Sequence, residues 1–134
     1  MPALALSGLD PASYFGRANG FLRGFAMIET REALDGIDAI LGVDGIDGIF
    51  IGPFDLSIGL SRGAALDPGG AEVSTAVDHA LARTRAAGKL AGIYAATGEI
   101  AADFAARGYD LVSVGSDLGF LGAGAAAAFS RARA

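Results

Sequence analysis

The chain has 134 residues, of which 52% are hydrophobic and 19% are charged. This length suits one compact domain, and the high apolar content excludes an intrinsically disordered segment. The net charge of −5 argues against a nucleic-acid partner, and the absence of cysteine excludes disulfides, thiolate metal sites and a cysteine nucleophile.

The start of the chain shows neither a secretory signal nor a membrane anchor. Residues 1–6 are apolar but lack a basic n-region, and an Asp-Pro pair follows at 10–11. No uncharged apolar run approaches the roughly 18 residues that a membrane-spanning helix needs. We therefore expect a cytoplasmic protein without a membrane partner.

The first half of the chain predicts a helix, a strand, a helix and a strand. Residues 10–20 predict a helix that begins at the Asp-Pro pair and ends at a glycine. The apolar segment 21–28 follows, then a helix over 30–41 with Thr30 as its cap, then the apolar segment 48–51. Neither apolar segment alternates with polar residues, which is typical of parallel strands covered on both faces.

The second half continues the same alternation after a long connection. Residues 54–70 are expected to form an irregular loop, and loops of this length in a compact domain are often functional. The elements expected after it are a helix over 73–88, a strand over 90–94, a helix over 100–108, a strand over 111–114 and an alanine-rich helix from 124 to the end.

The element order, one helix and then four strand–helix units, predicts an α/β fold with a parallel sheet and right-handed crossovers. Two architectures satisfy this order, an open doubly wound sheet or part of a (βα)8 barrel. A complete barrel needs about 200 residues or more, so four units amount to half of one. An isolated half barrel would leave two sheet edges and its inner face uncovered, which predicts a partner.

Two acidic residues follow neighbouring strands of the expected sheet. Glu29 comes directly after the first strand, and Asp55 comes shortly after the second. Because the carboxyl ends of parallel strands lie at one edge, about 4.8 Å apart, both carboxylates could reach one cation. Two carboxylates with open positions are typical of Mg²⁺ or Mn²⁺ sites. The alternative is structural, with Glu29 capping the next helix and Asp55 capping a turn.

The segment Gly52-Pro53-Phe54-Asp55 suggests an anion-binding turn. A glycine permits close approach of a ligand to the backbone, and proline fixes its own φ. The amides of Phe54 and Asp55 could then point at an anion. An ordinary strand-to-helix turn is the competing interpretation.

These residues belong to a longer set of motifs that occur in order. The set comprises Met27-Ile28-Glu29-Thr30, the run from Gly45 to Ser57, Ala87-Gly88-Lys89, and Val114-Gly115-Ser116-Asp117-Leu118. Together they closely resemble the HpcH/HpaI aldolase family, also called the citrate lyase β/2-keto-3-deoxy sugar acid aldolase family. The resemblance covers about residues 10–121, and residues 1–134 are expected to form a single partial domain of this type.

The resemblance implies the C-terminal half of a (βα)8 barrel and a metal-dependent aldolase, a carbon–carbon lyase. Such an enzyme cleaves a 2-keto-4-hydroxy acid to pyruvate, or a related keto acid, and an aldehyde. It implies that Glu29 and Asp55 bind Mg²⁺ or Mn²⁺ and that residues 52–55 bind the keto acid. No Schiff-base lysine is needed. Lys89, the only lysine, is expected at the opposite end of the barrel.

The chain also departs from the family pattern. The family's substrate-binding arginine and proton-transferring histidine come from N-terminal strands, so this chain carries neither catalytic residue. His79 is expected on the outer helical layer and cannot replace that histidine. Phe54 stands where the family usually has alanine, which alters the size of the pocket.

Several interpretations of the whole chain therefore stay open. It is a fragment or one half of an aldolase, or a non-catalytic or truncated barrel half that needs a partner chain. The partner would be a second copy, giving a homo-oligomer, or a separate N-terminal half. A lyase acting on coenzyme A thioesters, of the citrate lyase β type, is a third interpretation, disfavoured because no basic patch is present.

Overall fold

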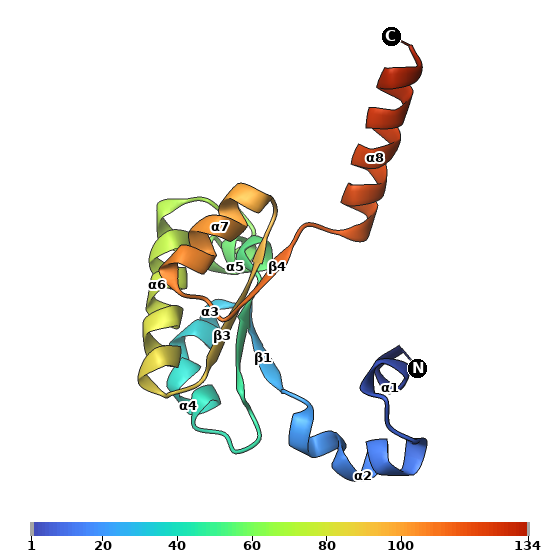
Figure 1. Cartoon of the computed structure of the whole chain (residues 1–134). Helices are drawn as coiled ribbons and strands as arrows, with labels where there is room; N and C mark the ends of the chain where they lie inside the picture. The colour runs from blue at the N-terminus through green and yellow to red at the C-terminus, as the bar shows by residue number, and fades with distance from the viewer. Residues whose placement is uncertain (1, 134) are drawn as a thin grey trace.

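The computed structural model describes residues 2–133 and has four parallel strands in a single sheet (Figure 1). The strands are β1 (Phe25–Ile28), β2 (Gly48–Ile51), β3 (Leu90–Ala95) and β4 (Leu111–Val114), and they lie side by side in sequence order. The helices are α1 (Pro2–Ser7), α2 (Pro11–Phe21), α3 (Arg31–Asp35), α4 (Ile37–Leu41), α5 (Pro53–Leu60), α6 (Ala71–Ala86), α7 (Gly98–Arg107) and α8 (Asp117–Ala132).

Strand order decides between the two architectures that the sequence left open. A doubly wound sheet reverses its strand order at a switch point. Here the order is β1-β2-β3-β4 without a reversal, and α3 to α7 cover one face of the sheet while α2 and α8 extend away from it (Figure 1). The predicted (βα)4 half barrel is confirmed.

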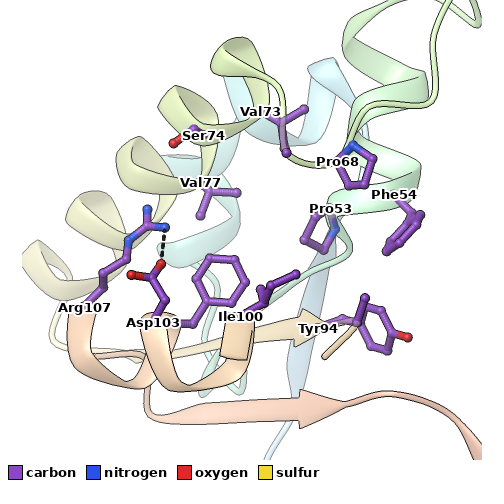
Figure 2. A pocket seen from close by; sticks show the side chains of 13 residues that line it. Pro53, Phe54, Pro68, Val73, Ser74, Val77, Tyr94, Ile100, Asp103 and Arg107 are labelled. Atoms are coloured by element: carbon purple, nitrogen blue, oxygen red, sulfur yellow. Dashed lines mark ion pairs between the residues drawn. The ribbon is translucent and has the colours of Figure 1, made fainter. Parts of the chain in front are cut away.

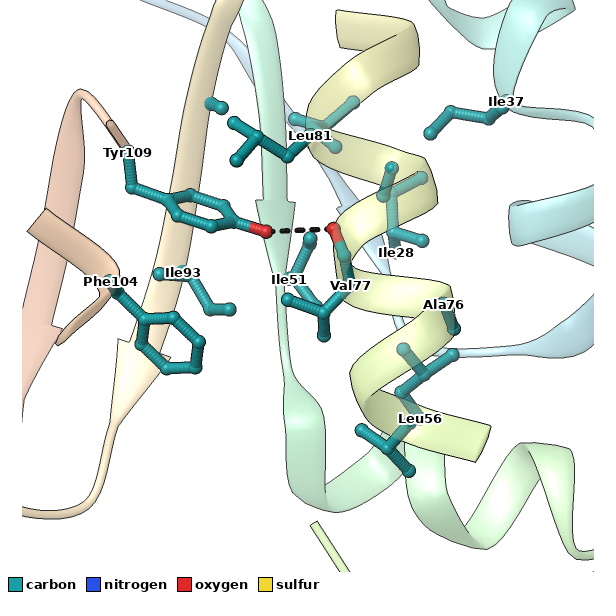
Figure 3. Packing of buried hydrophobic residues seen from close by; sticks show 14 of the residues in the cluster. Ile28, Ile37, Ile51, Leu56, Ala76, Val77, Leu81, Ile93, Phe104 and Tyr109 are labelled. Atoms are coloured by element: carbon teal, nitrogen blue, oxygen red, sulfur yellow. Dashed lines mark hydrogen bonds between the residues drawn. The ribbon is translucent and has the colours of Figure 1, made fainter. Parts of the chain in front are cut away.

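The hydrophobic core lies between this sheet and the helices that cover it. Alternate strand residues such as Ile28, Ile51 and Ile93 are fully buried there, because successive side chains of a strand point to opposite faces. They pack against Val77 and Leu81 of α6 (Figure 3). This packing fixes the strands, and hence the residues that follow them, against a rigid layer.

The opposite face of the sheet is the inner face of the half barrel. Its side chains include Met27, Leu90 and Leu111, which are 50%, 36% and 45% exposed. Phe50 also points to this side, and its ring lies over Gly92, where a Cβ atom would come within 2.6 Å of the ring. Within residues 2–133 no element covers this apolar face, as expected for half of a barrel.

Four predicted boundaries were wrong for local physical reasons. The strand predicted over 21–28 begins only at Phe25, because Phe21 completes α2. The irregular loop predicted over 54–70 begins with α5, since Pro53 at the first helical position suits a helix start. The helix over 30–41 divides at Gly36 into α3 and α4. The last helix begins at Asp117 rather than 124.

The predicted helix caps at Asp10 and Thr30 are confirmed. Asp10 accepts hydrogen bonds from the amides of Ala12 and Ser13 at 3.0 and 3.1 Å, and Thr30 accepts one from Ala33 at 3.1 Å.

Within residues 2–133, none of the helices combines the length and the apolar character that crossing a bilayer demands.

Candidate metal and substrate site

The candidate site lies where β1 and β2 end. Glu29 follows β1 directly, and Asp55 lies in the first turn of α5, which begins directly after Gly52 at the end of β2. Both acidic residues line one open concavity of about 420 Å³. Its lining consists of Met27, Glu29, Phe50, Gly52, Phe54, Asp55 and Tyr94. The structure therefore brings together the predicted residues Glu29, Gly52, Phe54 and Asp55, whereas Pro53 is buried and lies outside this lining.

Gly52 makes room for the side chain of Glu29. A Cβ atom built on Gly52 would lie 2.5 Å from Oε1 of Glu29, 3.0 Å from its Cγ and 3.2 Å from its Cδ. The carboxylate thus occupies the space that any other residue at position 52 would fill. This cradle holds the carboxylate at the carboxyl end of the sheet, beside the start of α5.

Glu29 does not cap the helix that follows it, which was the structural alternative to metal binding. Thr30 provides the cap of α3, through the hydrogen bond that its side chain accepts from Ala33. Asp55 lies in the first turn of α5, where a carboxylate interacts favourably with the helix dipole. Its position is therefore compatible with helix stabilisation as well as with metal binding.

The first turn of α5 also offers backbone donors. Amides in the first turn of a helix have no partner within that helix. Gly52 is the N-cap of α5 and, having no side chain, makes no side-chain cap hydrogen bond. The first backbone hydrogen bond of the helix is donated by the Leu56 amide to the Gly52 carbonyl at 2.9 Å. The amides of Phe54 and Asp55 precede it and so have no partner within α5.

The oxygen donors present fit a hard divalent cation. Two carboxylates line the concavity, and among the described residues no group of three or more His, Cys, Asp or Glu could enclose a metal. Mg²⁺ and Mn²⁺ are commonly held by one or two carboxylates with water and substrate oxygens in the other positions. A thiolate- or imidazole-rich metal centre is not offered by these side chains.

An aromatic pair forms one wall of the site. The rings of Phe54 and Tyr94 are arranged edge to face, with centroids 6.0 Å apart. Sequence reasoning proposed Phe54 but did not single out Tyr94. The signal was available, because Tyr94 alternates with the buried Ile93 and Ala95 of β3 and so points to the inner face.

Two other titratable side chains lie away from the site, as predicted. The Lys89 ammonium donates hydrogen bonds to the carbonyls of Val43 and Ile46 at 3.1 and 2.6 Å, at the end of the sheet where the strands begin. His79 is an exposed residue of α6. Neither lines the concavity.

A sequential parallel sheet with helices on one face, and with acidic side chains at its carboxyl ends, defines one half of an enzyme-type β/α barrel. The sequence pattern of the family described as HpcH/HpaI aldolase/citrate lyase matches residues 9–122. The chain belongs to this family.

Similar proteins support the same assignment. A hydroxypyruvate/pyruvate aldolase of Rhizorhabdus wittichii is 46% identical over 92% of this chain and 49% of its own length. A 4-hydroxy-2-oxo-heptane-1,7-dioate aldolase of Salmonella heidelberg is 42% identical over 89% of this chain and 44% of its own. The crystal structure of a family member from Burkholderia cenocepacia superposes with a TM-score of 0.80 at 27% identity, over 91% of this chain and 47% of that protein. The chain thus spans about half the length of these relatives.

Proposed function

We propose that this chain is the metal- and keto-acid-binding half of a divalent-metal-dependent carbon–carbon lyase. Its substrate would be a 2-keto-4-hydroxy acid, cleaved to pyruvate or a related keto acid and an aldehyde. The observation that carries this proposal is the convergence of Glu29 and Asp55 on one concavity, with Gly52 leaving space for the Glu29 carboxylate. The aldolase names of the two relatives support the reaction class.

Each residue has a defined role in this proposal. Glu29 and Asp55 would hold Mg²⁺ or Mn²⁺, which when bound supplies Lewis-acid polarisation of the substrate's keto group. The amides of Phe54 and Asp55 would donate hydrogen bonds to the substrate carboxylate. Together these contacts would orient the keto acid at the carboxyl end of β2.

The cleavage itself defines what else is required. The C3–C4 bond breaks, its electron pair moves onto the keto-acid fragment, and C4 becomes an aldehyde as its hydroxyl loses a proton. The keto-acid fragment then takes up a proton at C3. Among the described residues, the concavity includes no histidine, lysine or arginine to transfer these protons.

We propose that the missing group comes from a partner that covers the inner face. The exposed Met27, Leu90 and Leu111 and the open edges of β1 and β4 suit a second set of strand–helix units. That partner would be an N-terminal barrel half, since a second copy of this chain could cover the inner face but would not bring the missing group. The chain alone is then expected to bind metal and keto acid without appreciable turnover.

Metal binding by the full chain tests the first part of the proposal. Electron paramagnetic resonance measures free Mn²⁺ as protein is added. Glu29→Gln and Asp55→Asn are each expected to weaken binding at least tenfold. Glu32→Gln and Asp35→Asn, at exposed positions of α3, are the matched controls and should bind as the wild type does. Equal Mn²⁺ affinity in all five proteins would refute the assigned site.

Reconstitution tests the second part. The chain is mixed with the N-terminal half of the Rhizorhabdus wittichii relative, and pyruvate release from 4-hydroxy-2-keto acids is followed with Mg²⁺ or Mn²⁺. Activity is expected in the mixture and should be lost with Glu29→Gln. A mixture that forms a complex and binds Mn²⁺ but never releases pyruvate would favour the non-catalytic interpretation.

A further inference from the structure

A second cavity lies on the helix-covered side of the sheet, behind the aromatic pair of the candidate site (Figure 2). Its volume is about 250 Å³, and it lies between α5, α6, α7 and the segment before α6, partly open to solvent. Apolar side chains make up most of its lining, among them Pro53, Val73, Val77, Ile100 and Phe104. In Figure 2 the side chains of Pro53, Val77 and Ile100 come from three helices and face one space.

Phe54 and Tyr94 belong to both cavities. Each of these residues lines both the carboxylate concavity and the apolar cavity, so the two spaces adjoin at the aromatic pair. Phe54 is 37% exposed and directly precedes Asp55 in the chain. A molecule bound at the two carboxylates would therefore lie beside the aromatic pair that also lines the apolar space.

The charged groups at the edge of the apolar cavity are already paired. Arg107 forms an ion pair with Asp103 at 3.6 Å and another with Asp78, and its guanidinium lies over the Phe104 ring at 5.2 Å. Among the described lining residues, none offers an unpaired cation to a second carboxylate. The lining thus disfavours a charged occupant and favours an uncharged apolar one.

The size of the cavity sets an upper limit on that occupant. An apolar cavity on the order of 150 Å³ is enough to bind benzene. A space of about 250 Å³ therefore accommodates one aromatic ring or a short branched alkyl group.

We infer that this cavity receives the apolar substituent on C4 of the substrate, which enters past the aromatic pair of Phe54 and Tyr94. The inference rests on the proposed function and deepens it, because it names the substrate class as 4-aryl- or 4-alkyl-4-hydroxy-2-keto acids. The aldehyde product is then apolar. This differs from the heptane-1,7-dioate substrate in the name of the Salmonella relative, which carries a second carboxylate.

Methyl resonances of the full chain test the inference without requiring turnover. Benzaldehyde is titrated into protein with ¹³C-labelled isoleucine and valine methyl groups, and the methyl groups of Val73, Val77 and Ile100 are expected to shift together. The charged aldehyde 4-oxobutanoate is the comparison ligand and should leave them in place. Equal shifts with both aldehydes, or none with benzaldehyde, would overturn the apolar specificity.

Variants that fill the apolar cavity test whether benzaldehyde binds inside it. Ala96→Phe and Ser74→Phe place a ring into the space from two different walls and should each raise the benzaldehyde Kd at least tenfold. Ala102→Phe, at an exposed position of α7 outside the lining, is the matched control. Benzaldehyde binding unchanged by both filling variants would overturn the inference.

Mn²⁺ binding, measured on the same samples, separates the two proposals. Wild-type Mn²⁺ affinity without methyl shifts would refute the cavity inference and leave the metal site standing. Methyl shifts in a chain that does not bind Mn²⁺ would instead refute the proposed function, and with it the assignment of the cavity to this substrate.

Discussion

Gly52→Ala is the most direct test of how the candidate metal site is built. The backbone of Gly52, with φ −100° and ψ 92°, is accessible to alanine. The added Cβ would lie 2.5 Å from Oε1 of Glu29, about 0.9 Å short of the 3.4 Å at which ordinary contacts begin. Because the clashing atom is the far end of a flexible side chain, the carboxylate can move away and the fold is retained.

Gly52→Ala is expected to weaken metal binding while leaving the stability of the fold nearly unchanged. Displacing one of two carboxylate ligands by about 1 Å should weaken Mn²⁺ binding by about 10- to 100-fold, or about 1.4 to 2.8 kcal/mol. The free energy of unfolding should change by no more than about 1 kcal/mol, since alanine also restricts the unfolded chain. Isothermal titration with Mn²⁺ and urea denaturation measure the two quantities.

Gly98→Ala is the matched control. Gly98 is the first residue of α7, and a Cβ atom there would have no heavy atom within 4 Å. This variant should bind Mn²⁺ as the wild type does. If Gly52→Ala also retains the wild-type Mn²⁺ affinity, the Glu29 carboxylate is not held in the position that the structure gives it, and the reasoning fails.

Three further predictions concern the fold that supports the site. Tyr109→Phe removes the buried hydrogen bond that the phenol donates to the Val77 carbonyl at 3.0 Å, so urea denaturation should show a loss of about 1 kcal/mol; an unchanged midpoint would contradict this. Thr97→Ala removes the cap of α7 and should lower stability by about 0.5–2 kcal/mol, with less helical circular dichroism as a second readout. The hydrogen bond with Ser13 holds the pKa of the Asp10 carboxyl below its ordinary 3.8, so the cap of α2 is fully present above that pH and is lost as the pH falls through the lower folded-state pKa. A carboxyl ¹³C titration that places the Asp10 pKa above 3.8 would refute the predicted downward shift and the stability change with pH that follows from it.

Much of the fold could be predicted because its signals are local. Asp10 and Thr30 have the short side chains that cap helices, and both do so here. Uninterrupted apolar segments such as 48–51 indicated strands covered on both faces. The errors came where two local signals compete. Gly36 interrupts a helix that the apolar pattern of 30–41 continues through. The apolar character of Phe21 favours a strand, but this residue ends α2.

The candidate site was predictable only in part. Strand ends can be located from the sequence, which is why Glu29 and Asp55 were expected to meet. The role of Gly52 as the space beside the Glu29 carboxylate needs coordinates, because it depends on the register of Ile28 with Ile51 in neighbouring strands. The shared aromatic wall is a tertiary feature, since it joins α5 and β3 across about 40 residues of chain.

The strand order gives the sheet two different free edges. Within residues 2–133, β1 pairs with β2 alone and β4 pairs with β3 alone. A contact in which β4 of one copy meets β1 of the next joins unlike surfaces and can be repeated. Such head-to-tail growth either closes into a ring, as two four-stranded units do at eight strands, or continues as a filament. Closure would bury the apolar inner face, which a filament would leave exposed, so such an assembly would be expected to stop at the ring.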